Sequence, residues 1–115
     1  MKILICGDRN WGQPDKIKKH LLKYNNNCDT IITGGANGAD WYANLFAKEL
    51  GLQTVVVEAR WKEFGKAAGP MRNTQMLDLG PDKVVAFHSN IQNSKGTLNC
   101  IYQAKERGIP VEIIV

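Results

Sequence analysis

Short runs of apolar residues alternate along the chain with longer segments in which apolar residues recur every three or four positions. The short runs predict five β-strands, at residues 2–7, 29–32, 53–58, 82–87 and 110–115. The longer segments predict four amphipathic helices, which begin at Pro14, Ala39, Pro70 and Gly96. This alternation indicates an α/β fold, a Rossmann-like three-layer sandwich with a mostly parallel five-stranded sheet. We expect residues 1–115 to form one domain.

Each predicted helix has an apolar face that we expect to pack on the sheet. The residues of these faces are Ile17, Leu21 and Leu22 in the first helix, Ala39, Ala43, Phe46 and Leu50 in the second, Met71, Met76 and Leu77 in the third, and Leu98, Ile101 and Tyr102 in the fourth. Three consecutive valines predict that the strand at residues 53–58 is also buried. Residues 25–27 predict a polar turn, and the long connection at residues 59–69 predicts a functional loop.

A glycine-rich segment at residues 33–40, with the sequence TGGANGAD, joins the second predicted strand to the second helix. Glycines at such a junction allow a tight turn and the close approach of another molecule to the backbone. The first N–H groups of a helix lack partners within it and carry partial positive charge, so an anion such as phosphate binds there readily. Gly-Gly and Asn-Gly are also ordinary turn sequences, and Asp40 alone could complement the helix dipole. Both interpretations stay open.

Two basic residues stand where a helix start disfavours them. Arg72 lies in the first turn of the third predicted helix, and Lys95 lies at the entrance of the fourth. A cation at a helix N-terminus is unfavourable by about 0.3–1 kcal/mol, whereas a bound anion makes the same cation favourable. We expect both residues to contact an anion. The alternative is that both side chains extend into solvent at this small cost.

Ligands of parallel sheets bind beyond the carboxyl ends of the strands. Four distinctive loops are predicted at that edge, at residues 7–11, 34–40, 61–73 and 88–97. Trp11 and Trp61 either stack on a base or pack as a lid over the sheet. His88 follows a buried strand and is either an acid–base group or a structural histidine. The polar side chains that either contact ribose or a base edge or merely form turns are Asp8, Asn10, Asn37, Asn73 and Asn90.

Composition and charge narrow the classes of function. The net charge of +4 fits an anionic partner, but the basic residues crowded on the first helix are more typical of a solvated face than of a nucleic-acid site. Every apolar run is shorter than the ~18 residues that a membrane span needs. The three cysteines have neither metal-binding nor redox spacing, which favours a reducing cytoplasmic setting, no metal, and Cys6 and Cys100 as core residues.

The loop at residues 7–12 imitates two phosphate-binding motifs without matching either. Gln13 and Pro14 stand where a P-loop requires lysine and serine or threonine, so the sequence does not support Walker-type triphosphate hydrolysis. The middle glycine of the dinucleotide fingerprint is missing as well.

Two longer motifs occur in order along the chain. GGANGAD stands at residues 34–40, and AGPMRN stands at residues 68–73 and is followed by Met76, with Trp61 between the two motifs. They resemble the signature of the YspA-type, cpYpsA-related branch of the SLOG superfamily, whose usual form is GGARGAD, then W, then AGPxRNxxM. The resemblance extends over essentially the whole chain. It implies a Rossmann-like fold and a site for nucleotides or nucleotide-derived ligands; ADP-ribose-like or NAD-derived molecules and a role in phage–host conflict have been proposed for this branch.

The resemblance also implies three ligand loops. They contain Gly34, Gly35, Gly38 and Asp40 in the first, Gly69, Arg72 and Asn73 in the second, and Lys95, Gly96 and Thr97 in the third, where related chains usually read GGxGT. Residues 88–94 depart from the usual proline- and glycine-rich approach to the third loop, and Asn37 stands where the branch commonly has arginine. Related phosphoribohydrolases carry a catalytic glutamate soon after this GT, but residues 98–101 contain no carboxylate. Hydrolysis of an N-glycosidic bond is therefore in doubt, and Asp40 and Asp8 are weak catalytic candidates.

Three functions stay open. The first is a binding module that senses or sequesters a nucleotide-derived ligand, ADP-ribose or an NAD derivative, with no cofactor and no turnover. The second is an N-glycosidic-bond hydrolase, and the third, weaker one is single-stranded nucleic-acid binding as in the SLOG protein DprA. We expect a small-molecule nucleotide as partner, no nucleic acid, no membrane and, by analogy with SLOG proteins, a homodimer. The predicted ligand-binding residues are Gly7, Asp8, Arg9, Asn10, Trp11, Gly34, Gly35, Ala36, Asn37, Gly38, Asp40, Trp61, Gly69, Arg72, Asn73, His88, Lys95, Gly96 and Thr97.

Overall fold

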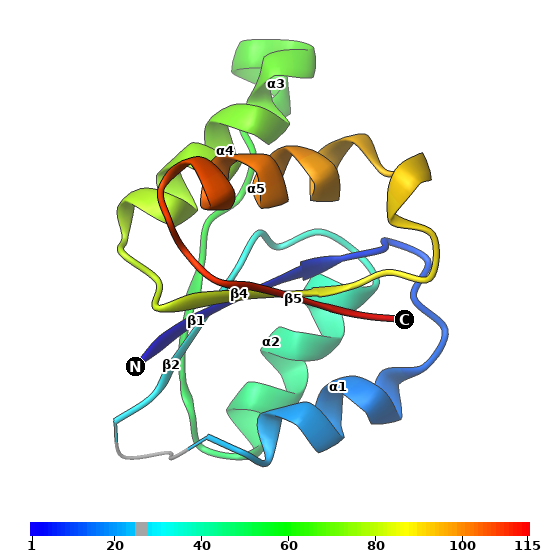
Figure 1. Ribbon diagram of the computed structural model, residues 1–115, viewed down its shortest axis with the longest axis vertical. Coiled ribbons are helices and arrows are strands. Elements are labelled where there is room, and N and C mark those ends of the chain that lie inside the picture. Colours follow the sequence, from blue (N-terminus) through cyan, green and yellow to red (C-terminus); the bar gives the residue numbers. More distant parts are fainter. Residues whose placement is uncertain (25–27) are drawn as a thin grey trace.

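The chain folds around one parallel sheet (Figure 1). The computed structural model describes residues 1–24 and 28–115. The strands are β1 (Lys2–Gly7), β2 (Thr30–Thr33), β3 (Gln53–Val56), β4 (Lys83–Phe87) and β5 (Val111–Ile114). All neighbouring strands pair in parallel, in the order β3-β2-β1-β4-β5. The predicted Rossmann-like fold with a five-stranded parallel sheet is confirmed.

Helices cover both faces of this sheet. Helices α1 (Pro14–Leu21) and α2 (Ala39–Glu49) lie on one face, and α4 (Ala68–Asp78) and α5 (Lys95–Glu106) lie on the other (Figure 1). A short helix α3 (Trp61–Phe64) and a 3₁₀ turn η1 (Gly65–Ala67) precede α4, and a second 3₁₀ turn η2 (Ile91–Asn93) precedes α5. In the part of the chain that the structure describes, no helix has the length and apolar content needed to cross a membrane.

The central strands read as continuous apolar runs because both of their faces are buried. In β1, Ile3 and Ile5 belong to the core beneath α1 and α2, whereas Leu4 and Cys6 belong to the core beneath α4 and α5. The strand also pairs with β2 on one side and with β4 on the other. The carboxyl ends of β1 and β4 therefore have defined positions, from which the loops that follow them begin.

Strand β3 lies at the edge of the sheet, and the prediction that residues 53–58 form a buried strand is wrong. Val55 and Val56 are 39% and 40% exposed because β3 has a neighbouring strand on one side alone. The opposite edge strand, β5, is also partly exposed. A run of valines indicates a strand, but it does not state where in the sheet that strand lies.

Three residues predicted on buried helix faces are instead exposed: Leu22, Met71 and Tyr102. Leu22 lies just past the last residue of α1. Tyr102 follows the buried Ile101 and is rotated about 100° from it around α5. Helix α4 begins at Ala68, two residues earlier than predicted, and its buried stripe does not include Met71.

The connection at residues 59–69 is more regular than the loop that the sequence predicts. It contains α3 and η1, and it leads into α4 without an intervening irregular segment. Trp61 and Phe64 of α3 are largely exposed. The polar turn predicted at residues 25–27 lies outside the described residues.

Matched substitutions in a central strand and in an edge strand test this strand order directly. We expect Val85→Ala in β4 to lower the free energy of unfolding by about 2–3 kcal/mol, because the removed methyl groups leave a cavity in a fully buried site. The same substitution at the half-exposed Val55 in β3 should cost less than about 1 kcal/mol. Urea denaturation of both variants measures the difference, and equal losses would contradict the strand order.

Candidate functional site

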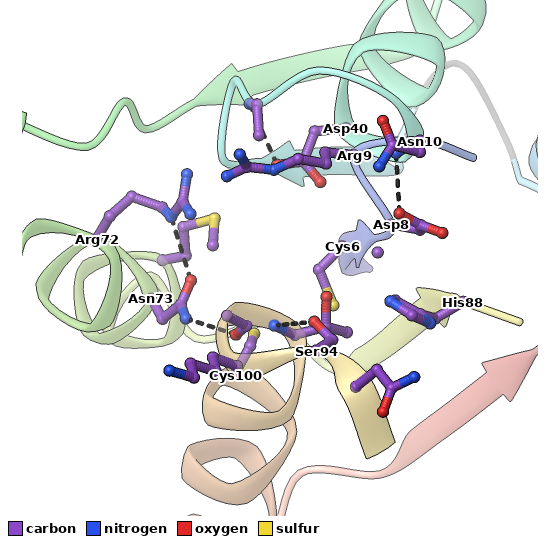
Figure 2. A pocket seen from close by; sticks show the side chains of 17 residues that line it. Cys6, Asp8, Arg9, Asn10, Asp40, Arg72, Asn73, His88, Ser94 and Cys100 are labelled. Carbon is purple, nitrogen blue, oxygen red and sulfur yellow. Dashed lines mark hydrogen bonds between the residues drawn. The ribbon is translucent and has the colours of Figure 1, made fainter. Parts of the chain in front are cut away.

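A pocket of about 390 Å³ lies at the carboxyl ends of β1 and β4 (Figure 2). The strand order reverses between these two neighbouring strands, which is where α/β sheets bind ligands. The lining comes from the ends of both strands, from the glycine-rich loop before α2, and from α4 and α5. The lining residues are Cys6, Gly7, Asp8, Arg9, Asn10, Ala36, Asp40, Arg72, Asn73, Met76, His88, Asn93, Ser94, Lys95, Gly96, Thr97 and Cys100.

Arg72 connects α4 to the glycine-rich loop. Its Nη1 donates to the carbonyl oxygen of Gly34 at 2.6 Å, and its Nε donates to Oδ1 of Asn73 at 3.1 Å. The Asn73 amide in turn donates to the carbonyl of Gly96 at 3.2 Å and to Oδ1 of Asn99 at 3.1 Å. The guanidinium is thus held in a defined position by groups from the loop and from α4, and α4 is tied to α5 through the same network.

Arg72 does not lie in the first turn of its helix, so the argument from a misplaced cation fails for this residue. Because α4 begins at Ala68, Arg72 belongs to its second turn. Pro70 is the third residue of the helix, where its missing N–H costs nothing, and a proline there does not mark the start of the helix. Lys95 is the first residue of α5, which begins one residue before the predicted start at Gly96.

Asp40 lies in the first turn of α2 and is only 6% exposed. Its Oδ2 accepts hydrogen bonds from the backbone N–H groups of Gly34 at 3.1 Å and Ala36 at 3.4 Å. Burial raises the pKa of this carboxyl to about 6, although the nearby Arg72 charge and the two N–H bonds act in the opposite direction. The Asp40 carboxylate therefore serves as a hydrogen-bond acceptor for the glycine-rich loop.

The sequence left two interpretations of the glycine-rich loop open, and three amides of this loop and of α2 have partners within the protein. The Gly34 and Ala36 amides bind Asp40, and the Ala39 amide at the start of α2 donates to the Asp8 carbonyl at 3.0 Å. Gly38 makes this last contact possible, because a Cβ at its positive φ of 73° would overlap the backbone of Asp8. The first amide of α2 is thus bonded within the protein.

The N-terminus of α5 lines the pocket directly. Ser94 is its N-cap, and its Oγ accepts a hydrogen bond from the Thr97 N–H at 3.1 Å. Lys95 and Gly96 form the start of the first turn and also line the pocket. With no acidic residue in that turn, the positive end of the α5 dipole and the Lys95 ammonium both favour an anion.

His88 directly follows β4 and is buried against the pocket, with 8% of its surface exposed. Its Nδ1 accepts a hydrogen bond from the backbone N–H of Asn90 at 2.9 Å. A backbone N–H can only donate, so Nδ1 carries no proton and the neutral ring carries its proton on Nε2. The histidine can therefore donate from Nε2, and this contact does not pair it with a carboxylate.

Two thiols lie together at the base of the pocket. Cys6 at the end of β1 and Cys100 in α5 are both buried, as the sequence predicts, and both line the pocket. A hydrogen bond with Cys100, together with burial, raises the pKa of the Cys6 thiol well above its ordinary value. Cys6 is a weak nucleophile in this setting.

The structure brings most of the predicted site residues into this one pocket. Those that line it are Gly7, Asp8, Arg9, Asn10, Ala36, Asp40, Arg72, Asn73, His88, Lys95, Gly96 and Thr97. The predicted residues outside the lining are Trp11, Gly34, Gly35, Asn37, Gly38, Trp61 and Gly69. Sequence reasoning did not assign Cys6, Met76, Asn93, Ser94 or Cys100 to a site. Ser94 had a usable signal, since serine just before the start of a predicted helix is typical of an N-cap.

The two tryptophans do not offer stacking surfaces to this pocket. Trp11 is only 5% exposed, packs edge-on against Phe87 with ring centroids 5.7 Å apart, and donates from Nε1 to the Gln13 carbonyl. It is a core residue, and the prediction that it stacks on a base is wrong. Trp61 is 54% exposed on α3 and lies beside Gly69, outside the pocket lining.

The parallel sheet and the pocket at its switch point define a Rossmann-like α/β domain. The model of the YspA, cpYpsA-related SLOG family matches residues 1–64. The chain belongs to this family. Membership associates it with nucleotide-related functions.

Two relatives extend this finding. The Gene 61 protein of Mycobacterium phage D29 is 30% identical over 121 residues, which cover 96% of this chain and 93% of the phage protein. DNA processing protein A (DprA) from Streptococcus pneumoniae superposes with a TM-score of 0.76 over 99% of this chain, at 20% identity. The chain spans 50% of the DprA chain, so this likeness concerns the fold.

Burial of the Asp40 carboxylate makes a pH-dependent prediction. Because the folded pKa of about 6 lies above the ordinary value of 3.8, the folded state binds the proton more tightly, and stability falls as pH rises between these values. Between pH 4 and pH 8, we expect the free energy of unfolding of Asp40→Asn to rise by about 2 kcal/mol relative to that of the wild type, while the amide oxygen of the new side chain keeps the loop bonds. Urea denaturation across this range measures the gain. A difference that is constant or shrinks with pH would contradict the burial of a charge.

Proposed function

We propose that the pocket binds a phosphate-bearing nucleotide or nucleotide-derived ligand, such as ADP-ribose or an NAD derivative, and holds it without turnover. The observation that carries this proposal is the convergence of three cations, Arg9, Arg72 and Lys95, with the N-terminus of α5 on one pocket. A volume of about 390 Å³ falls within the range of small-molecule sites. The protein would act as a sensor or as a sink for such a molecule.

The ordered guanidinium of Arg72, with N–H donors still unused, supports a phosphate ligand. A guanidinium has five N–H donors, and the bonds to Gly34 and Asn73 use one from Nη1 and the one from Nε. The remaining donors belong to a group that is already ordered, so an anion binding there meets little further loss of side-chain entropy. Arginine held in this way suits the planar, bidentate recognition of phosphate.

The basic residues of α1 do not contribute to this site. Lys16 donates to the carbonyl of Val115, Lys18 lies 4.0 Å from Glu49, and no residue of α1 lines the pocket. These contacts support a small-molecule partner over single-stranded nucleic acid.

Two features support binding over catalysis. His88 accepts a backbone N–H at Nδ1, which leaves it without the carboxylate that would orient it as a general base. The raised pKa of the Cys6 thiol makes it a poor nucleophile. In the described part of the pocket, no nucleophile and base lie in the hydrogen-bonded pair that covalent catalysis requires.

Family membership and the phage relative support a role in phage–host conflict, in which a nucleotide signal is sensed or removed.

The cysteines support a reducing, cytoplasmic setting, because Cys6, Cys28 and Cys100 all carry free thiols. Exposed apolar residues on β3 (Val55 and Val56) and on α3 (Trp61 and Phe64) support the homodimer that SLOG analogy suggests.

Thermal shift tests the proposed ligand class with ADP-ribose, cyclic ADP-ribose, NAD and AMP. We expect at least one of them to stabilise the protein, by about 2.7 kcal/mol at 100 times its dissociation constant. Arg72→Gln should weaken that ligand roughly 10- to 100-fold, because charged hydrogen bonds contribute about 1.5–3 kcal/mol. Arg107→Gln is the matched control, since Arg107 pairs with Asp78 outside the pocket and should not affect binding. Failure of every phosphate-bearing nucleotide to stabilise the wild type would overturn the proposal.

A second function, hydrolysis of an N-glycosidic bond, is favoured by one observation. Asp40 is a buried carboxyl with a pKa raised to about 6 in a cationic pocket, which is the behaviour of many general acids. Its engagement with two loop amides argues for a structural role instead. The binding proposal therefore predicts that AMP and NAD stay intact after long incubation at high protein concentration. Chromatography that detects free base, lost in Asp40→Asn while binding persists, would establish the hydrolase in its place.

A further inference from the structure

The geometry points to a ribose 5-phosphate unit as the part of the ligand that the pocket encloses, with the base left outside. This inference rests on the proposed function, and it assigns the side of the pocket that holds Asp8 and His88 as a site for the ribose hydroxyl groups. Its basis is the distribution of charge and of aromatic side chains around the lining.

The pocket has two chemically different sides. Figure 2 shows Arg72 on one side, and Asp8 and His88 on the opposite side across the opening. A phosphate belongs beside Arg72 and the start of α5, where the cation and the helix dipole attract it. The Asp8 carboxylate repels phosphate, so the opposite side suits a neutral group that donates hydrogen bonds.

Asp8 offers such a group an acceptor. Its Oδ1 accepts the backbone N–H of Asn10 at 2.9 Å, which fixes the orientation of the carboxylate just after β1. Among the described residues, no basic side chain forms an ion pair with Asp8. The second oxygen therefore keeps its full capacity to accept a hydrogen bond from a ligand.

His88 offers the matching donor. Because its Nδ1 accepts the Asn90 N–H, the proton of the neutral ring lies on Nε2. An oriented acceptor and an oriented donor that line one side of a pocket suit adjacent hydroxyl groups, each of which both donates and accepts. The 2′ and 3′ hydroxyls of ribose are such a pair, and they lie on the same sugar as the 5′ phosphate.

The described lining contains none of the large aromatic rings on which bases most commonly stack. In the described part of the chain, no phenylalanine, tyrosine or tryptophan lines the pocket, since Trp11 is packed in the core and Trp61 lies outside. Recognition of a base ordinarily uses aromatic stacking, which contributes about 1–3 kcal/mol per base in single-stranded complexes. The pocket is thus built for the phosphorylated sugar, and it should accept different bases equally.

Calorimetric titration of the wild type with AMP, UMP, 2′-deoxy-AMP, ribose 5-phosphate, ADP-ribose and inorganic phosphate tests this assignment. We expect AMP and UMP to bind within about three-fold of each other and ribose 5-phosphate to bind comparably. 2′-Deoxy-AMP should bind at least roughly ten-fold more weakly than AMP. It lacks one of the two hydroxyl groups that Asp8 and His88 are proposed to bind, so a polar group of the pocket loses its partner.

Asp8→Asn separates a sugar contact from general electrostatics. Its amide oxygen can still accept the Asn10 N–H, and the lost negative charge favours anions, so inorganic phosphate should bind at least as tightly as before. AMP should nevertheless bind Asp8→Asn more weakly than it binds the wild type, and this variant should bind AMP and 2′-deoxy-AMP with similar affinity. Asp15→Asn, the same change at an exposed position on α1 outside the pocket, should leave all affinities unchanged.

The outcomes distinguish the two proposals. If none of the six compounds binds, the proposed function is overturned along with this inference. If ADP-ribose binds while AMP, UMP and ribose 5-phosphate do not, the ribose 5-phosphate assignment alone is wrong. The same holds if UMP binds more than ten-fold more weakly than AMP, or if wild type does not discriminate against 2′-deoxy-AMP.

Discussion

The site depends on how two opposite charges hold one residue of the glycine-rich loop. Asp40 accepts the N–H of Gly34, and Arg72 donates to its carbonyl oxygen, so both backbone groups of this residue are bonded to ionised side chains. A Cβ at Gly34 would overlap both the guanidinium and the carboxylate. The glycine is therefore required by close approach of side chains. Through this arrangement, α2 on one face of the sheet is connected to α4 on the other, across the end of β2.

Local sequence patterns predict the central strands and the helices because the apolar pattern of each element recurs along its whole length. The apolar runs of β1 and β4 are buried on both faces, and the helices place apolar residues at intervals of three or four positions. The position of β3 at the sheet edge is a property of strand order, to which Val55 and Val56 contribute no local information. Pro70 is a similar case, because proline is tolerated throughout the first turn and does not define its first residue.

The sequence predicts where the candidate site lies more readily than it predicts what each residue does there. Parallel strands bring their carboxyl ends to one edge, so loops far apart in the sequence, such as those containing Asp8 and Lys95, meet there. Sequence alone does not distinguish an amide that awaits a ligand from one that an internal carboxylate already binds. Asp40 fits both interpretations in the sequence, and its bonds to Gly34 and Ala36 favour the second. For Trp11, a loop position likewise does not state which way the ring faces.

The starts of α2 and α5 differ in how the protein uses their amides, and this difference supports the phosphate position that we propose, at α5. Asp40 and the Asp8 carbonyl occupy three amides around the start of α2, and they add negative character there. The start of α5 has no acidic residue in its first turn and carries Lys95, with Arg72 facing the same pocket from α4. A phosphate placed at α2 would compete with the buried Asp40 carboxylate, whereas one placed at α5 would lie beside Lys95, for which the described residues show no ion pair. The same carboxylate that orders the glycine-rich loop thus supports the proposed orientation of the ligand, with its phosphate toward α5.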